Sequence, residues 1–236
     1  MSLLVFEHHP DETPAVLGSI LQSYGHRLRV VELDEGDAVP VDLDDVDGIV
    51  SMGGPMNVDE VGRHPWLEPE IAYLNTAHQA GVPIVGVCLG AQLVAKALGG
   101  DVAPMKEPEV GWQNVRLAFG GTIDPIYTGI GWDTMQFHTH SRQVTQLPPD
   151  ATPLAGSKMC RCQAFRVTLT TYAFQYHFEW DIQALMRVAT DGLVKEAGTS
   201  TDRIIADCRT YYDDYRRLGD RLCHTIATVL FPIVKT

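Results

Sequence analysis

The chain has 236 residues, 45% of them hydrophobic, and its 30 acidic and 18 basic residues give a formal net charge of -12. A chain of this length can bury a full core, but its negative charge repels phosphate backbones and anionic lipids, so we expect no nucleic-acid or membrane partner. No apolar run approaches the roughly 20 residues that cross a bilayer, and "MSLLVFEHHPDE" has no basic leader, so we expect a cytoplasmic protein.

The first hundred residues alternate between short apolar runs and helical patterns. Apolar runs typical of strands occupy residues 3–8, 27–33, 47–54 and 83–88, and helical patterns occupy 12–25, 65–81 and 89–100. Strands that are apolar on both faces and alternate with helices predict a parallel sheet that helices cover.

The pattern changes after residue 110. Segments 112–119, 133–141, 163–170 and 172–179 are typical of strands, some of them antiparallel, and residues 181–236 follow a helical pattern. We therefore predict an α/β fold with three layers (αβα), built on a mostly parallel open sheet with some antiparallel strands. We expect a single domain over 1–236, with a core of about 1–181 and a C-terminal helical extension of about 182–236.

Cys88 stands at the junction of a strand and a helix. Five cysteines, an odd number, do not indicate a disulfide framework in a chain of this length. Gly86 and Gly90 flank Cys88 in a G-x-C-x-G pattern, which is typical of the tight turn that presents a nucleophile. The free NH groups at a helix N-terminus also favour a thiolate. The alternative is a small buried side chain in the core.

"FQYHFEW" provides a base and an acid at the end of an apolar strand. His177 and Glu179 are two residues apart, so in an extended segment they face the same side. A carboxylate beside an imidazole fixes its tautomer and stabilises the imidazolium that forms when a thiol loses its proton. The alternative is a histidine that only packs in the core.

"IVSMGGPMN" ends a strand with two glycines. Gly53 and Gly54 let the backbone approach a substrate, and the NH of Gly54 can point at it together with the NH of Leu89 at the start of the next helix. The segment therefore predicts an oxyanion hole, although a simple turn would have the same composition.

Together these segments resemble the class I glutamine amidotransferase domain, the glutaminase of GMP synthetase, anthranilate synthase and carbamoyl phosphate synthetase. The resemblance rests on "GVCLGAQ" (86–92), "MGGP" (52–55) and "FQYHFE" (174–179) and covers about residues 3–181. "GGPMNVDE" and "MKEPEVGWQNVRL" are similar to stand-alone, GMP-synthetase-like members. The resemblance implies a flavodoxin-like fold.

The resemblance also implies a mechanism. His177, held by Glu179, would accept the proton of Cys88, and the thiolate would attack the side-chain amide of glutamine. Ammonia would leave a γ-glutamyl thioester, which water or another acceptor would then cleave. By resemblance, Gln92 would bind glutamine.

The resemblance extends to the segment that lines the glutamine pocket in the family. "THSRQVTQLPPDATPLAGS" (139–157) is similar to that segment, and we expect His140 and Ser141 in it to bind substrate together with Gly53.

The chain carries no ATP-binding motif. The ammonia would therefore pass to a synthetase supplied as a partner protein. Alternatively, the enzyme would hydrolyse a γ-glutamyl compound as a γ-glutamyl peptidase. A homo-oligomer is also compatible with the sequence.

Two further alternatives stay open. An α/β-hydrolase with a cysteine nucleophile shares G-x-C-x-G, but it orders its triad nucleophile, acid, histidine, and here Glu179 follows His177. The other is a binding module on an inactive glutaminase fold.

Three short pairs of ligand-type residues stand outside these motifs. They are His8 with His9, His138 with His140, and Cys160 with Cys162. None has a second pair at zinc-finger spacing, so we predict no metal and no cofactor.

Overall fold

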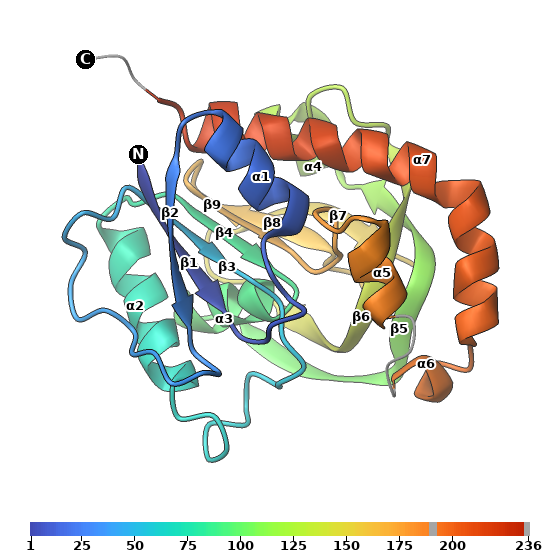
Figure 1. Ribbon diagram of the computed structural model, residues 1–236, viewed down its shortest axis with the longest axis horizontal. Coiled ribbons are helices and arrows are strands. Elements are labelled where there is room, and N and C mark those ends of the chain that lie inside the picture. The colour runs from blue at the N-terminus through green and yellow to red at the C-terminus, as the bar shows by residue number, and fades with distance from the viewer. Residues whose placement is uncertain (189–192, 234–236) are drawn as a thin grey trace.

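A computed structural model describes residues 1–188 and 193–233, and they form a nine-stranded mixed sheet with helices on both faces (Figure 1). The strand order is β2-β1-β3-β4-β9-β8-β7-β5-β6. The first five strands in that order are parallel neighbours, namely β2 (Arg27–Glu32), β1 (Ser2–Glu7), β3 (Gly48–Ser51), β4 (Ile84–Val87) and β9 (Thr171–Phe174). Every residue of β3, β4 and β9 is buried, as the mainly apolar sequences of these strands predict.

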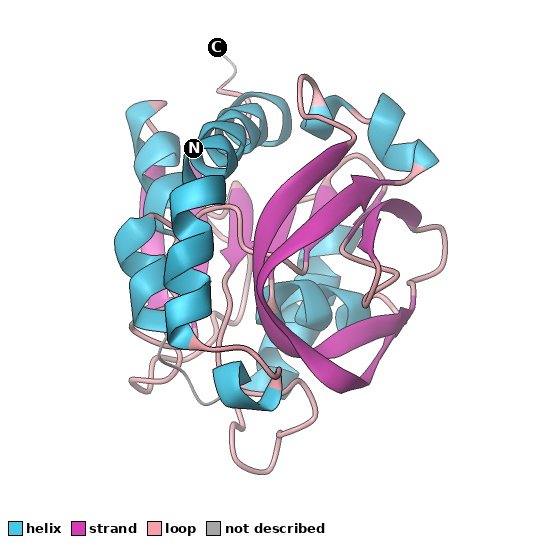
Figure 2. Cartoon of the chain, turned by 90° about the vertical axis from the view of Figure 1, so that its right-hand side faces the viewer, coloured by secondary structure: helices cyan, strands magenta, loops and turns pink. Residues whose placement is uncertain are grey.

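The remaining strands form the antiparallel half of the sheet. They are β8 (Ala164–Val167), β7 (Thr152–Ser157), β5 (Asp101–Leu117) and β6 (Asp133–Gln146). The two long strands β5 and β6 curve together away from the parallel half (Figure 2). The flavodoxin-like α/β fold that the sequence predicts is confirmed. The segment 139–157, expected to line a pocket, is divided between β6 and β7.

Side chains alternate across the parallel strands and build one core on each face of the sheet. Leu3 and Val5 pack with helix α1 (Ala15–Ser23) on one face, and the C-terminal π-helical turn Ile226–Leu230 lies in the same core. Leu4 and Phe6 pack on the opposite face with helices α2 (Leu67–Gln79) and α3 (Leu89–Ala97). The sheet and the helices packed on its two faces through these cores form the three layers.

The C-terminal region wraps from the antiparallel half back to α1 (Figure 1). This region contains α5 (Ile182–Val188), α6 (Leu193–Glu196) and the long α7 (Thr201–Thr225). A short helix α4 (Phe119–Ile123) and a 3-10 turn (Pro125–Tyr127) lie earlier in the chain, between β5 and β6. The parts of the expected helices at 189–192 and 234–236 lie outside the described residues. Within the described ranges, no helix is both long and apolar enough to cross a membrane. The division into a core and an extension stays a prediction.

Candidate active site

Cys88 occupies a strained turn between β4 and α3. Its backbone has φ 53° and ψ -105°, a conformation that costs a residue with a side chain about 1–3 kcal/mol. The two flanking glycines make the turn fit, because a Cβ on Gly86 would lie 2.6 Å from the carbonyl oxygen of Gly90. The NH of Gly90 also donates to the carbonyl of Met52 at 3.0 Å. The turn therefore has the geometry that the sequence predicts for a nucleophile.

His177 and Glu179 form a completely buried pair just beyond β9. Nδ1 of His177 lies 2.7 Å from Oε1 of Glu179, and the backbone NH of Phe178 donates to the other carboxylate oxygen at 2.8 Å. The indole ring of Trp180 stacks on the imidazole at 3.6 Å. Because a carboxylate accepts, Nδ1 carries a hydrogen, and Nε2 is the nitrogen that can take a proton from another group.

Charges around His177 favour its imidazolium form. Burial lowers the pKa of His177, but the carboxylates of Glu179 and Glu12 outweigh burial, and the charge of Cys88 adds to them, so the pKa is raised well above 6.5. Nε2 of His177 has no hydrogen-bond partner among the described residues. A thiolate on Cys88 would thus face a stable cation.

The glycine loop after β3 is held by a buried polar network. Nδ1 of His8 lies 3.0 Å from the carbonyl oxygen of Gly53, and its Nε2 lies 2.8 Å from Glu70. The hydroxyl of Ser51 donates to the same carboxylate at 2.7 Å. The network fixes the backbone that precedes Gly54.

Gly54 and Leu89, the two predicted oxyanion-hole residues, lie together. A Cβ on Gly54 would meet the side chain of Leu89 at 3.0 Å. Leu89 is the first residue of α3, and the first NH groups of a helix have no acceptor within it. Both backbone segments therefore approach the same space beside Cys88.

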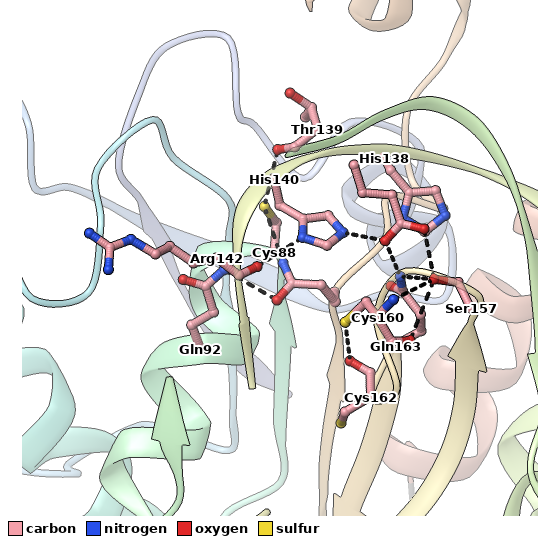
Figure 3. Close-up of polar contacts among 12 residues, drawn as sticks. Cys88, Gln92, His138, Thr139, His140, Arg142, Ser157, Cys160, Cys162 and Gln163 are labelled. Atoms are coloured by element: carbon pink, nitrogen blue, oxygen red, sulfur yellow. Dashed lines mark hydrogen bonds and ion pairs between the residues drawn. The ribbon is translucent and has the colours of Figure 1, made fainter. Parts of the chain in front are cut away.

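A cavity of about 220 Å³ opens at this point, on the carboxyl edge of the parallel strands. Gln92 lines it and donates to Gln175 at 3.2 Å, and the amide of Gln175 lies 3.8 Å from the sulfur of Cys88. Figure 3 shows Cys88, Gln92 and His140 approaching this region from different elements. The lining residues are Glu12, Gly54, Pro55, Met56, Asn57, Cys88, Leu89, Gln92, Thr139, His140, Ser141, Arg142 and Leu193.

The structure thus brings most predicted site residues to one cavity. Gly53 lies beside it, where a Cβ would approach the Glu12 carboxylate and come within 3.1 Å of the His177 ring. His177 and Glu179 lie behind the cavity rather than on its wall.

Sequence reasoning misses two charged residues of this cavity. Glu12 is buried, and its Oε2 has no hydrogen-bond partner among the described residues. Its position just after the carboxyl end of β1 is the one signal that could have indicated it. Arg142 bonds the side chain of Asn57 at 3.0 Å and pairs with Asp59 at 3.1 Å, so it connects β6 to the glycine loop. That contact follows no local pattern.

Comparison with known proteins identifies the family. Residues 15–189 match the family model described as Glutamine amidotransferase class-I. Because the match spans well over half of the chain, the protein belongs to this family, as its motifs predict.

Three relatives are similar to this chain over most of its length. The glutamine amidotransferase-like protein YfeJ of Salmonella typhimurium is 28% identical over 221 residues, which cover 91% of each chain. A glutamine-hydrolyzing GMP synthase subunit of Natronomonas pharaonis is 32% identical over 149 residues, or 63% of this chain and 73% of that protein. The γ-glutamyl-L-1-hydroxyisopropylamide hydrolase of a Pseudomonas species is 28% identical over 199 residues, or 78% of this chain and 66% of that protein.

The fold is shared with a glutamine amido transferase from Methylobacillus flagellatus. The two structures superpose with a TM-score of 0.85 over 95% of this chain and 93% of the other, at 23% identity. At that identity the likeness concerns the fold alone.

Proposed function

We propose that this protein is a cysteine-dependent hydrolase of γ-glutamyl amides, with glutamine as its first substrate. The observation that carries the proposal is a cysteine in a strained turn on the cavity wall, with the buried pair of His177 and Glu179 behind that wall. A structural cysteine would need neither the strain nor the adjacent imidazolium.

The chemistry uses groups on the cavity wall and the histidine behind it. Nε2 of His177 takes the thiol proton, and the Cys88 sulfur attacks the amide carbon of the substrate. The NH groups of Gly54 and Leu89 donate to the oxygen that becomes negative in the tetrahedral intermediate. His177 then returns the proton to the leaving nitrogen, and ammonia departs.

The second half of the reaction reuses the same histidine. The γ-glutamyl group is held on sulfur as a thioester, and water that gives its proton to His177 attacks it. Glutamate leaves, and the thiol recovers its proton. The amide of Gln92 and the hydroxyl of Ser141 would bind the rest of the substrate, and the ring of His140 would contact it by packing, since all three line the cavity.

Cleavage of a γ-glutamyl amide larger than glutamine is the second candidate. The similarity to the Pseudomonas hydrolase favours it, because that protein's name specifies a γ-glutamyl amide of an amino alcohol. The relation to the Natronomonas GMP synthase protein favours ammonia delivery to a synthetase partner instead. A cytoplasmic location and such a partner belong to this proposal.

Amide hydrolysis by the purified protein tests both candidates. Ammonia and glutamate would be measured with glutamine as substrate, and free amine would be measured with γ-glutamyl amides. We expect Cys88→Ser to lower turnover at least about 1,000-fold while keeping the fold, because serine is nearly the same size but a much poorer nucleophile here. Undiminished turnover by Cys88→Ser would remove Cys88 from the mechanism, and a folded protein inactive on every amide would favour the binding module.

A further inference from the structure

A second cluster of reactive side chains lies behind the cavity wall, where β5 and β6 pair. Glu109 stands opposite His140 in the antiparallel register, and Gly111 stands opposite His138. Because residues two apart on a strand share a face, both imidazoles lie on the side of the Glu109 carboxylate. Nε2 of His140 is 3.2 Å and Nδ1 of His138 is 3.9 Å from the same oxygen, Oε2.

The tautomer of His140 shows that a positive charge belongs between it and Glu109. Nδ1 of His140 lies 2.8 Å from the backbone carbonyl of Arg142, and a carbonyl only accepts, so Nδ1 carries the hydrogen. On a neutral ring, Nε2 then presents a lone pair to a carboxylate oxygen. Such an arrangement is repulsive unless a proton or a metal ion lies between the two atoms.

The surroundings of His138 favour a metal ion over a proton. It is fully buried, and within the described ranges neither of its ring nitrogens has a hydrogen-bond partner. A buried polar group without a partner costs about 1–3 kcal/mol. A proton on His140 would satisfy the pair with Glu109 and leave His138 unpaired, whereas a metal ion would take one nitrogen from each ring.

The surrounding residues hold Glu109 and His140 in place by hydrogen bonds, as the neighbours of metal ligands do. Ser157 donates to Oε1 of Glu109 at 2.7 Å, and the amide of Gln163 donates to Oε2 at 2.6 Å (Figure 3). His140 donates its other ring NH to a backbone carbonyl, a common arrangement for a histidine that binds a metal. The carboxylate of Glu109 and the imidazole of His140 are therefore orientated before any ion arrives.

We propose that Glu109, His138 and His140 bind a divalent transition metal ion such as Zn²⁺. All three ligand atoms lie within 4.8 Å of one another, and ligands around tetrahedral zinc are about 3.3 Å apart, so small side-chain shifts close the site. Imidazole and carboxylate together suit zinc. An ion reaches the site through the cavity, since His140 also lines it.

The sequence-based prediction of no metal rests on spacing within each motif. His138 and His140 form a pair without a second ligand pair in the sequence, and the third ligand, Glu109, comes from the strand that pairs with β6. The bound ion would clamp the cavity wall that carries His140 and Ser141 to β5. Its role is therefore to fix the shape of the substrate pocket and not to touch the reacting amide.

Zinc binding to the full chain tests the proposal independently of catalysis. The parent for the experiment is Cys88→Ser, because a thiolate in the active site would bind zinc itself. After removal of bound metal with a chelator, Zn²⁺ would be titrated against a chromogenic chelator. We expect one ion per chain, with affinity reduced at least about tenfold in His138→Gln and in Glu109→Gln.

His26 supplies a matched control. It is also a buried histidine with no hydrogen-bond partner on either ring nitrogen in the described part of the chain, but it lies beside Phe231 of the first core and outside this cluster. His26→Gln should keep the parent's zinc affinity. Equal affinity in His138→Gln and His26→Gln, or no saturable binding by the parent, would overturn the proposal.

Cobalt provides a readout that needs no further variant. Co²⁺ bound to the parent through imidazole and carboxylate in a site of low coordination number should give intense visible absorption, which Zn²⁺ abolishes by displacement. A spectrum identical to that of hydrated Co²⁺ would overturn the proposal even if the His138 and Glu109 variants failed to fold.

Discussion

At the scale of single residues, the site combines strain with buried charge. Cys88 holds a positive φ that only a packed surrounding can maintain, and Glu12 is a buried carboxyl group whose Oε2 has no hydrogen-bond partner in the described ranges. Both features oppose stability and are therefore typical of residues kept for chemistry. Glu12 also lies close enough to raise the pKa of His177.

Glu12→Gln should shift the pH dependence of catalysis. Removing this negative charge lowers the pKa of His177, so the imidazolium that protonates the leaving nitrogen is lost at lower pH. We expect the alkaline limb of kcat/KM to move down by about one pH unit, as measured with glutamine across the neutral and alkaline range.

Asp11→Asn is the matched control for this shift. Asp11 is a neighbouring carboxylate that is half exposed and pairs with Arg187, so its removal should leave the limb in place. An unmoved limb in Glu12→Gln would show that its charge does not act on His177.

At the scale of elements, glycines set how closely β3, β4 and α3 approach. A Cβ on Gly90 would collide with the carbonyl group of Ser51 in β3. The backbone on both sides is buried and hydrogen-bonded, so neither segment can move away cheaply.

Gly90→Ala should therefore destabilise the protein by at least about 2 kcal/mol. Urea unfolding followed by circular dichroism measures the change. Gly62→Ala is the control, because a Cβ there meets nothing within 4 Å and the backbone is not in the positive-φ region. Equal stability of the two variants would contradict the packing described here.

The elements also show how far sequence reasoning reaches. The strands around Cys88 and the pairing of His177 with Glu179 can be predicted because each follows from residues adjacent in the chain or in one motif. Strand β7 escapes prediction, since its sequence "TPLAGS" lacks an apolar alternation. Glu109 escapes it as well, because its meeting with His138 depends on the register of β5 against β6, which no local pattern encodes.

At the scale of the whole molecule, the C-terminal helix supports the site. Gly219 of α7 lies so close to the segment after β9 that a Cβ would collide with the carbonyl oxygen of Phe178. Arg216 donates to the carbonyl of Trp180 at 2.7 Å. Both contacts flank Glu179, so α7 fixes the backbone that carries the acid and does more than cover the sheet.

Gly219→Ala should lower kcat about tenfold to a hundredfold by displacing Glu179 from His177, since small misplacements of catalytic groups have effects of this size. KM should change much less, because the substrate contacts lie on other elements. Steady-state kinetics with glutamine measures both.

Thr210→Ala is the control for this variant, because Thr210 lies on the exposed face of the same helix. Full kcat in Gly219→Ala would show that α7 does not hold the acid.

Labelling by an electrophilic glutamine analogue, such as a diazoketone, tests the central claim most directly. The other cysteines, Cys160, Cys162, Cys208 and Cys223, are buried internal controls, and burial raises the pKa of each. Peptide mass spectrometry should find one label per chain on Cys88, prevented by excess glutamine and absent in His177→Gln. Label on another cysteine, or a folded protein that stays unlabelled, would contradict the assignment of Cys88 as the nucleophile.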